Sequence, residues 1–122
     1  MTMESHYRKL ENMLHDAPFA RLTQARIEIE KGKAEVTVPV ARHLFHAAEA
    51  IHGAIYFMAL DNAAWFAVNS LVTDTFVLTV SFNVYFIRPV NKGVIRAVGR
   101  VTNTTRTQYF AEAVLYDEDD NE

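Results

Sequence analysis

The stretch from Ala50 to Leu71 constrains the fold more than any other part of the sequence, because it is apolar on nearly every face of a helix. It contains no glycine or proline after Gly53. A helix with apolar side chains all round is stable only when other elements cover it on every side. The sequence therefore predicts one long central helix with the rest of the chain wrapped around it.

Segments with the alternating pattern of β-strands lie before and after this helix. Before it, residues 25–38 alternate apolar and polar side chains around a Lys31-Gly32 turn, which predicts a hairpin. After it, the alternation is strongest in "TDTFVLTVSFNVYFIRP". Three strands are predicted there, at residues 73–89, 93–103 and 107–117.

A short amphipathic helix is predicted near the start of the chain, at residues 5–18. Its apolar face consists of Tyr7, Leu10, Met13 and Leu14. The order of elements is then helix, two strands, long helix and three strands. This order predicts an α+β domain, residues 1–122, in which an antiparallel sheet curls around the central helix.

Composition limits the classes of function. The chain has 122 residues, of which 50% are hydrophobic and 22% charged, as in an ordinary globular domain. It has no cysteine, which excludes disulfides, thiolate metal sites and a cysteine nucleophile. No apolar run is long enough to cross a bilayer and the first residues do not resemble a signal peptide, so a cytoplasmic protein without a membrane partner is expected.

Charge is distributed unevenly along the chain. The net charge is −3, but the acidic tail at residues 117–122 holds five of the 15 acids. The remaining ten acids face 12 bases, so the body of the protein is mildly basic. This balance fits a phosphate-bearing small molecule better than nucleic acid, and no nucleic-acid partner is expected.

Asp61 stands near the middle of the apolar helix. Burying an unpaired carboxylate among apolar side chains destabilises the folded state by an amount on the order of several kcal/mol, so the presence of Asp61 needs a reason. One reason is structural, namely a cap on a neighbouring backbone group or a pair with an arginine. The other reason is chemistry, in which the carboxylate serves as a general base or a nucleophile.

Two stretches together carry a family resemblance: "IHGAIYFMALDNAA" and, after it, "LTVSFNVYFIRPV". They resemble the hotdog-fold acyl-CoA thioesterases of the PaaI-like group, over roughly residues 6 to 116. In that group a His-Gly-Gly turn opens the central helix, and an acid lies nine positions beyond the histidine. The matching residues here are His52, Gly53, Ala54 and Asp61. The resemblance implies a hotdog fold and a thioester hydrolase that binds its substrate between paired subunits, often assembled further into tetramers.

The chain departs from the group's pattern at several positions. Ala54 replaces the second glycine of the turn, His46 replaces an asparagine, and Glu49 replaces a glycine. The group also runs on from the strand ending at Tyr116 into one more strand, which lies between two others. The acidic tail stands in that place here, so the resemblance implies either a gap in the sheet with unpaired backbone groups or a sheet that closes differently.

The chemistry of thioester hydrolysis assigns roles to the matched residues. The unpaired N–H groups of Gly53 and Ala54, at the start of the helix, point along a dipole that favours negative charge on the substrate carbonyl oxygen. Asp61 acts in the hydrolytic step, as a general base for a water or as a nucleophile. Eight residues of helix place it about 12 Å from Gly53 along the axis. Both groups can act on one thioester only if a second copy of the chain supplies one of them, so the site requires a homodimer.

Other site residues follow from the resemblance. His52 is expected to orient the turn through a hydrogen bond, in preference to carrying protons. Thr79 is expected near the acid, where its hydroxyl holds a water; its alternative reading is an ordinary β-branched strand residue. Substrate contacts are assigned to His46, Glu49, Tyr56, Asn62, Arg88, Lys92 and Arg106, the last three for the phosphates of coenzyme A.

Polar residues recurring every three positions, His43, His46, Glu49 and His52, superficially indicate a metal site. On a helix this spacing drifts around the axis, and it is not the zinc pattern His-Glu-x-x-His. We expect no metal and no cofactor.

The main functional prediction is hydrolysis of a small or medium acyl-CoA. The alternative is a non-catalytic acyl-CoA or fatty-acyl binding module on the same scaffold, which the changes at Ala54, His46 and Glu49 favour. A third class is a structural dimerisation domain. A dehydratase is less favoured, since no Asp and His pair has a plausible spacing.

Overall fold

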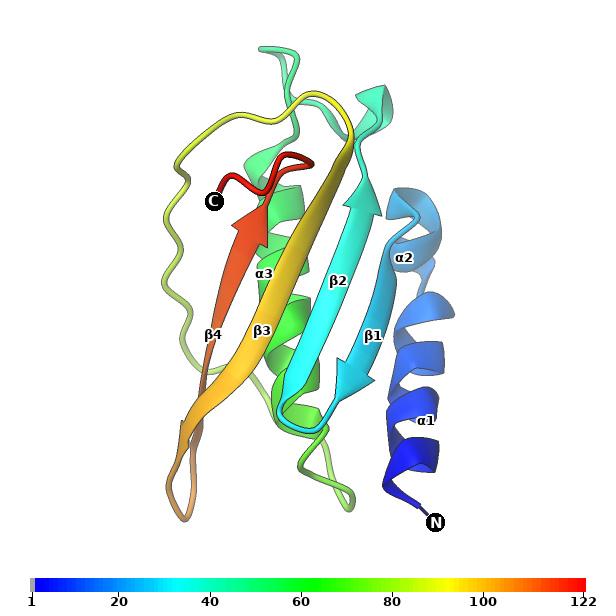
Figure 1. Ribbon diagram of the computed structural model, residues 1–122, viewed down its shortest axis with the longest axis vertical. Helices are drawn as coiled ribbons and strands as arrows, with labels where there is room; N and C mark the ends of the chain where they lie inside the picture. The colour runs from blue at the N-terminus through cyan, green and yellow to red at the C-terminus, as the bar shows by residue number, and fades with distance from the viewer. Residues whose placement is uncertain (1) are drawn as a thin grey trace.

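The computed structural model describes residues 2–122 and contains one antiparallel sheet curled over a long helix (Figure 1). The helices are α1 (Met3–His15), α2 (Pro18–Thr23), the 3-10 turn η1 (Arg42–Leu44) and α3 (Gly53–Asn69). The strands are β1 (Arg26–Glu30), β2 (Lys33–Pro39), β3 (Val94–Thr104) and β4 (Tyr109–Tyr116). The predicted α+β architecture is confirmed.

The sheet has the order β1-β2-β3-β4, and every neighbouring pair is antiparallel. β1 and β2 form the predicted hairpin, whose turn contains Gly32 with a φ of +69°. This φ lies in the left-handed region, which glycine adopts without steric cost. β3 joins β2 along its whole length, with Ala34 opposite Gly99 and Val36 opposite Ala97.

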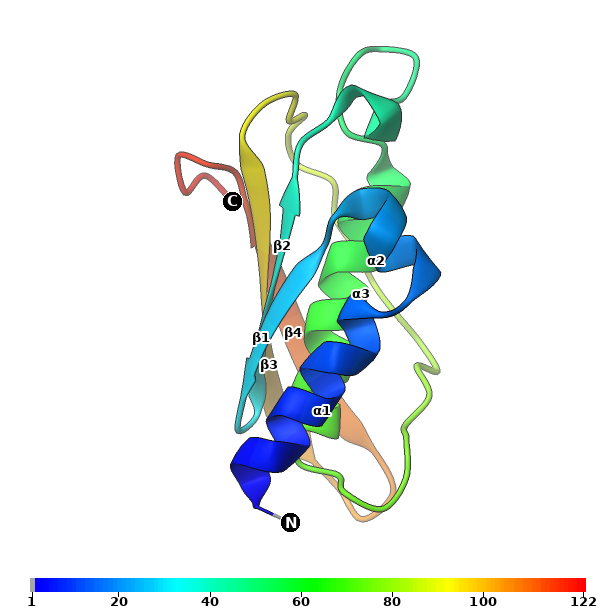
Figure 2. The ribbon, with the colours of Figure 1, turned by 90° about the vertical axis from the view of Figure 1, so that its right-hand side faces the viewer.

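The central helix α3 lies across the concave face of the sheet, as the periodicity predicts (Figure 2). Its residues Ala59, Ala63 and Ala67 have no solvent-exposed surface, and they face Ala97 and Ile95 of β3, which are equally buried. Small residues on the helix and the sheet let the two backbones approach closely. A Cβ built at Gly99 would lie 2.3 Å from the carbonyl carbon and oxygen of Ala63.

Helix α1 lies along the outer edge of β1 and supplies hydrogen bonds to that strand (Figures 1 and 2). The backbone N–H of Ile29 donates to Glu11 Oε2 at 2.8 Å, and that of Ile27 donates to His15 Nε2 at 3.1 Å. These side chains satisfy amides that an edge strand would otherwise leave unpaired. Of the predicted apolar face of α1, Met13 is 39% exposed and does not join the core.

The prediction that residues 73–89 form a strand of the sheet is wrong. This segment is extended, but within residues 2–122 it makes no strand pairing. It runs beside α3 on the side away from β1, β2 and β3, as the thin trace in Figure 2 shows. The alternation correctly predicts an extended backbone, but among residues 2–122 no strand lies between this segment and β4 to pair with it.

None of the helices within residues 2–122 combines the length and the apolarity that a bilayer crossing requires.

Stability should fall as the pH is lowered below about 6.5, through His15. Burial, followed by the nearby Arg26 guanidinium, lowers the pKa of His15 from its ordinary 6.5. Below this value the unfolded chain binds the proton more readily than the folded chain, so acid favours unfolding. Protonation also removes the lone pair that accepts the Ile27 amide.

The matched control is His15→Gln, because a glutamine oxygen accepts the same amide without titrating. We expect the melting temperature of the wild type to fall more steeply between pH 7.5 and 5.5 than that of the variant, measured by circular dichroism at about five pH values. Parallel slopes for the two proteins would contradict this role.

Candidate active site

The N-terminus of α3 is capped by a histidine side chain. His52 has extended backbone angles, and its Nδ1 accepts the N–H of Ala54 at 2.9 Å. The expected orienting hydrogen bond of His52 is therefore present. It also occupies the Ala54 amide, so the expectation of two open amides is wrong for Ala54. Among the hydrogen bonds within residues 2–122, none uses the N–H of Gly53.

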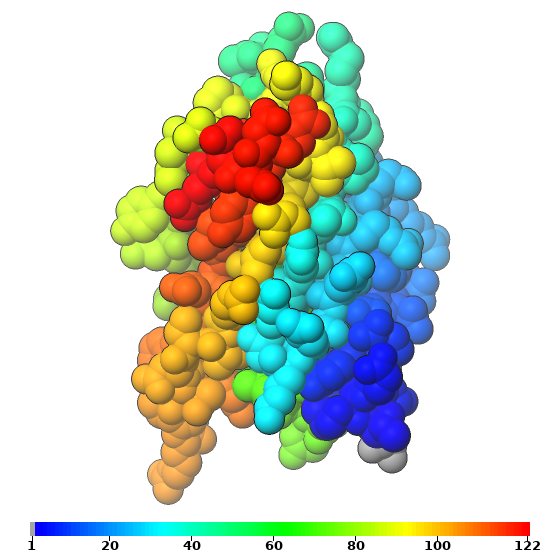
Figure 3. All heavy atoms as spheres, in the orientation of Figure 1, coloured from blue at the N-terminus to red at the C-terminus, as the bar shows by residue number. Residues whose placement is uncertain are grey.

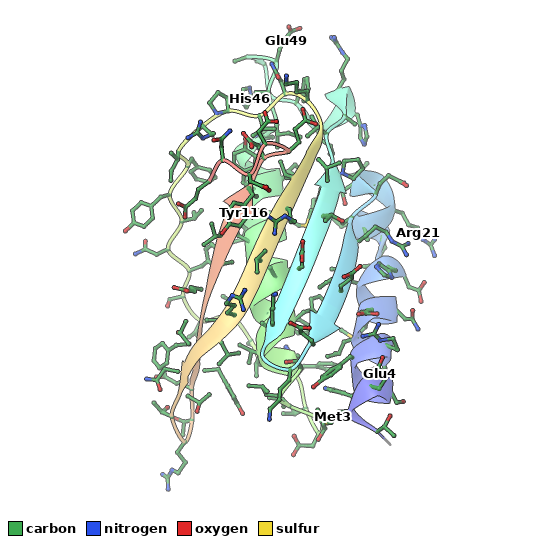
Figure 4. The ribbon with its side chains drawn as sticks, in the orientation of Figure 1. Met3, Glu4, Arg21, His46, Glu49 and Tyr116 are labelled. Carbon is green, nitrogen blue, oxygen red and sulfur yellow. The ribbon has the colours of Figure 1, made fainter. Side chains whose placement is uncertain are left out.

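The loop before α3 carries the two other substituted positions. His46 lies close to the helix start, with its ring centroid 6.3 Å from that of His52, and its Nδ1 accepts the N–H of Ala48 at 3.0 Å. Glu49 has a φ of +65°, a conformation that glycine adopts more readily. Its carboxylate lies 3.7 Å from the Arg42 guanidinium, and both side chains are largely exposed. Figure 4 shows Glu49 at the tip of this loop, farther from α3 than His46.

Asp61 lies eight residues further along α3, partly exposed. Thr79, on the extended segment, donates its hydroxyl to Asp61 Oδ1 at 3.1 Å. The carboxylate is therefore neither unpaired nor fully enclosed by apolar groups. The hydrogen bond fixes one carboxylate oxygen and leaves Oδ2 for other partners.

The segment from Phe76 to Phe86 contacts α3 at four levels. Trp65 Nε1 donates to the Val77 carbonyl at 2.9 Å, and the ring centroids of Phe57 and Phe82 lie 4.6 Å apart. The other contacts are Trp65 with Phe76, Asp61 with Thr79, and Tyr56 with Phe86. The segment therefore runs antiparallel to α3 and holds Thr79 at the level of Asp61.

Gly53 and Asp61 lie far apart within one chain. Both belong to α3, and eight residues of helix span about 12 Å. Asn62, next to the acid, is also partly exposed. One chain by itself does not bring the helix start and the acid to a single carbonyl group.

Tyr56 has a structural role within this chain. Its side chain is buried, and its hydroxyl donates to the Arg88 carbonyl at 3.2 Å. Burial raises the pKa of the Tyr56 phenol, so the hydroxyl remains a donor at neutral pH. The bond ties the far end of the extended segment to the first turn of α3.

The basic residues assigned to substrate phosphates do not form one cluster. Arg88 and Lys92 are exposed in the loop that precedes β3, and Arg88 Nε donates to the Glu122 carbonyl at 3.0 Å. Arg106 lies in the turn after β3, at the opposite end of that strand (Figure 1). An 11-residue strand spans about 35 Å, so Arg106 cannot meet a ligand held by Arg88 in the same chain.

Two further bases lie on the outer face of the sheet. Arg96 pairs with Glu35 at 3.5 Å and with Asp120 at 3.2 Å, and its guanidinium lies over the Tyr116 ring at 4.6 Å. Arg100 is on the same face as Arg96, two residues along from Val98. Within residues 2–122 no group of three or more metal-ligating side chains is found.

Sequence reasoning missed the contacts that place the acid. From the sequence alone, Phe57 and Trp65 are either core aromatics or part of the lining of an acyl pocket, whereas in the structure each anchors the extended segment against α3. The available signal was their spacing of four residues on either side of Asp61, which places all three on one face of the helix.

A four-stranded antiparallel sheet wrapped around a central helix, with a carboxylate midway along that helix, defines a hotdog-fold domain. The chain belongs to the Thioesterase superfamily, whose family model matches residues 49–122.

Known proteins agree with this assignment. A thioesterase family protein of Silicibacter pomeroyi is 28% identical, with a TM-score of 0.86 over 95% of this chain and 88% of that chain. The PaaI protein of Escherichia coli, at 18% identity, has the same fold, with a TM-score of 0.87 over 99% of this chain and 88% of that one. A relative from Thermoplasma volcanium whose name calls it an esterase is 27% identical over 109 residues, 88% of this chain and 82% of its own.

Proposed function

We propose that the protein hydrolyses the thioester of a small or medium acyl-CoA at a site shared by two copies of the chain. The observation that carries this proposal is the partly exposed Asp61 carboxylate, held by Thr79 in a chain of the Thioesterase superfamily. Hydrolysis of a thioester needs an activated water or a nucleophilic carboxylate, together with a donor for the carbonyl oxygen. Asp61 supplies the base or the nucleophile, and the Gly53 N–H supplies the donor.

The hydrogen-bond donor and the carboxylate come from different subunits. The N–H of Gly53 in one protomer donates to the thioester carbonyl oxygen, aided by the dipole of α3. Asp61 of the partner subunit takes a proton from a water whose oxygen attacks the carbonyl carbon, or attacks that carbon itself. In the first route the C–S bond breaks as Asp61 returns the proton to the leaving thiolate. In the second route the thiolate leaves and is protonated by solvent, and a water then hydrolyses the anhydride formed with Asp61, which releases the acid and regenerates the carboxylate. Two α3 helices placed antiparallel across a two-fold axis bring these groups together twice per dimer.

The remaining residues bind the substrate. Arg88, whose carbonyl accepts the hydroxyl of Tyr56 in the first turn of α3, and Lys92 in the same loop are assigned to the phosphates of coenzyme A. Arg106 meets the same ligand only from another subunit. His46, whose ring lies near that of the capping His52, and Asn62, which follows the acid in the sequence, are assigned to contacts with the thioester.

The test is thiol release from a panel of short, medium, long and aromatic acyl-CoAs. We expect release from at least one short or medium member, with a rate above that of the buffer alone. Tight binding of acyl-CoA with no thiol release over hours would replace the hydrolase by an acyl-binding module. A thermal-shift screen with no stabilisation by any acyl-CoA would favour a structural dimerisation domain.

Gly53→Pro should reduce kcat about a hundredfold, because it removes the N–H that donates to the carbonyl oxygen. Proline is favoured at the first position of a helix, and His52, with φ −63° and ψ 138°, has the backbone angles that a following proline requires. The control is Gly53→Ala, which keeps the N–H and adds a Cβ 3.2 Å from the movable ring of Phe86. Equal rates for the two variants would remove this amide from the mechanism.

A further inference from the structure

Trp65 is the only tryptophan of the chain, and it lies one turn of α3 beyond Asp61. Side chains four residues apart lie on the same face of a helix, so the indole and the carboxylate meet the same neighbour, the extended segment at residues 76–88. Figure 3 shows yellow-green atoms of this segment at the left margin of the molecule, away from the blue atoms of α1. The place of each segment residue along α3 depends on the contacts between the two.

Two aromatic neighbours hold the indole ring of Trp65. The ring of Phe66, which is buried, meets it edge-on, with centroids 4.7 Å apart and an interplanar angle of 79°. The ring of Phe76 lies closer to parallel with it, at 5.9 Å and 21°. These two rings fix the plane of the indole and so the direction of its N–H, which donates to the Val77 carbonyl at 2.9 Å.

Three side-chain hydrogen bonds join α3 to this segment within residues 2–122. One is the bond from Thr79 to the acid itself. The bond from Trp65 to the Val77 carbonyl is two residues away from Thr79, whereas the bond from Tyr56 to the Arg88 carbonyl is nine residues away. Burial of apolar surface is non-directional, whereas a hydrogen bond weakens steeply as its partners move out of line. The Trp65 bond is therefore the directional contact nearest to Thr79.

We propose that Trp65 is a positioning residue for the Asp61 carboxylate. Its indole N–H holds the Val77 carbonyl and thereby keeps the Thr79 hydroxyl at the level of the acid. A slip of the segment by one residue would move this hydroxyl by about 3.3 Å and turn it to the opposite face. Asp61 Oδ1 would then lose its donor, and the carboxylate would turn freely. The consequence for catalysis rests on the proposed function, whereas the consequence for the hydrogen bond does not.

The hydrogen bond can be observed without any substrate. In protein labelled with carbon-13, the side-chain carboxyl carbon of Asp61 is identified as the signal that is lost in Asp61→Asn. Trp65→Phe keeps an aromatic ring and removes the N–H, so we expect it to shift this signal in the same direction as Thr79→Val does. The matched control is Tyr56→Phe, which also deletes one donor to a carbonyl of the segment. It should leave the Asp61 signal in place.

A double-mutant cycle in thiol release tests the effect on catalysis. We expect Trp65→Phe to lower kcat about tenfold with KM changed less than about twofold, because a misplacement of about 1 Å costs up to about a hundredfold. In the Thr79→Val background the same substitution should change kcat less than about twofold, because Trp65 acts through Thr79. A merely structural role would lower kcat equally in both backgrounds.

The wild type supplies a measurement that does not depend on the folding of any variant. As the only tryptophan, Trp65 gives a single indole N–H signal in a nitrogen-15 spectrum. While it is bonded to the Val77 carbonyl, this N–H should exchange with solvent at least about tenfold more slowly than that of free tryptophan.

Three results would overturn the inference. One is exchange of the indole N–H as fast as in free tryptophan, and a second is an unmoved Asp61 signal in Trp65→Phe. The third is a pair of kcat effects that multiply in the double variant. A shifted Asp61 signal in a protein that hydrolyses no acyl-CoA would refute only the proposed hydrolase, and hydrolysis with an unmoved signal would refute only the role of Trp65.

Discussion

Asp61→Asn is expected to reduce thioester hydrolysis about a thousandfold at saturating substrate. An amide neither accepts the proton of the attacking water nor forms an anhydride, and loss of a positioned general base typically costs about 10²–10⁴ in rate. The asparagine oxygen still accepts the hydroxyl of Thr79, which now donates to Asp61 Oδ1 at 3.1 Å. Thiol release under single-turnover and steady-state conditions measures the loss.

The fold should survive this change. Asp61 is partly exposed and makes its described hydrogen bond to an exposed threonine, so the melting temperature is expected to stay within about 2 °C of the wild type. Thr79→Val is the companion variant: it keeps the β-branched shape and removes only the hydroxyl. A rate unchanged by Asp61→Asn would exclude this carboxylate from the mechanism.

Mixed dimers separate a shared site from a site within one chain. A subunit with Asp61→Asn still has an intact Gly53, and a subunit with Gly53→Pro still has an intact Asp61. If the subunits exchange freely, half of the dimers are mixed and each has one complete site, so about a quarter of the wild-type activity should return. No recovery in dimers shown to be mixed would contradict the two-subunit site.

Gly99→Ala is expected to lower the melting temperature by more than about 10 °C, or to prevent folding. The added Cβ would lie 2.3 Å from the Ala63 carbonyl and 2.7 Å from the Ala64 N, and these are backbone atoms in the middle of α3. Relief requires α3 to move away from β3, which loosens a closely packed core. Overpacking of this kind costs about 1–3 kcal/mol or more.

The control for this substitution is Gly53→Ala, which makes the same chemical change where the nearest atom belongs to the half-exposed Phe86 ring. Its melting temperature should stay close to that of the wild type in thermal denaturation followed by circular dichroism. If the two variants melt together, the approach of α3 to β3 at Gly99 is not what limits stability.

The elements that were predicted correctly have local signals. α3 follows from its apolar composition, and the hairpin and the last two strands follow from alternation and turn residues. The segment at residues 73–89 has an equally clear local signal, yet strand pairing depends on a neighbour that no local pattern describes. The prediction that Met13 belongs to the buried face of α1 was wrong for a related reason. The width of the buried face of a helix depends on which elements cover it.

The candidate site was predictable where contacts are fixed by helix spacing. The distance from Gly53 to Asp61 and the cap at His52 follow from positions along one helix. The occupation of the Ala54 amide was not predictable, because it depends on which way the His52 ring turns. The separation of Arg88 from Arg106 was not predicted, because the two were grouped as late basic residues of the sequence. The length of the strand between them, β3, was not taken into account.

Within residues 2–122, β4 pairs with a strand on one side only, and its other side also bears on how these residues behave when concentrated. Molecules that meet along this side can extend one another's sheets, and the apolar rings of Tyr109 and Phe110, 41% and 47% exposed, favour such encounters. The five acids of residues 117–122 sit at one end of the same surface and repel their counterparts on an approaching molecule. Colloidal stability therefore depends on keeping these carboxylates ionised and the ionic strength low.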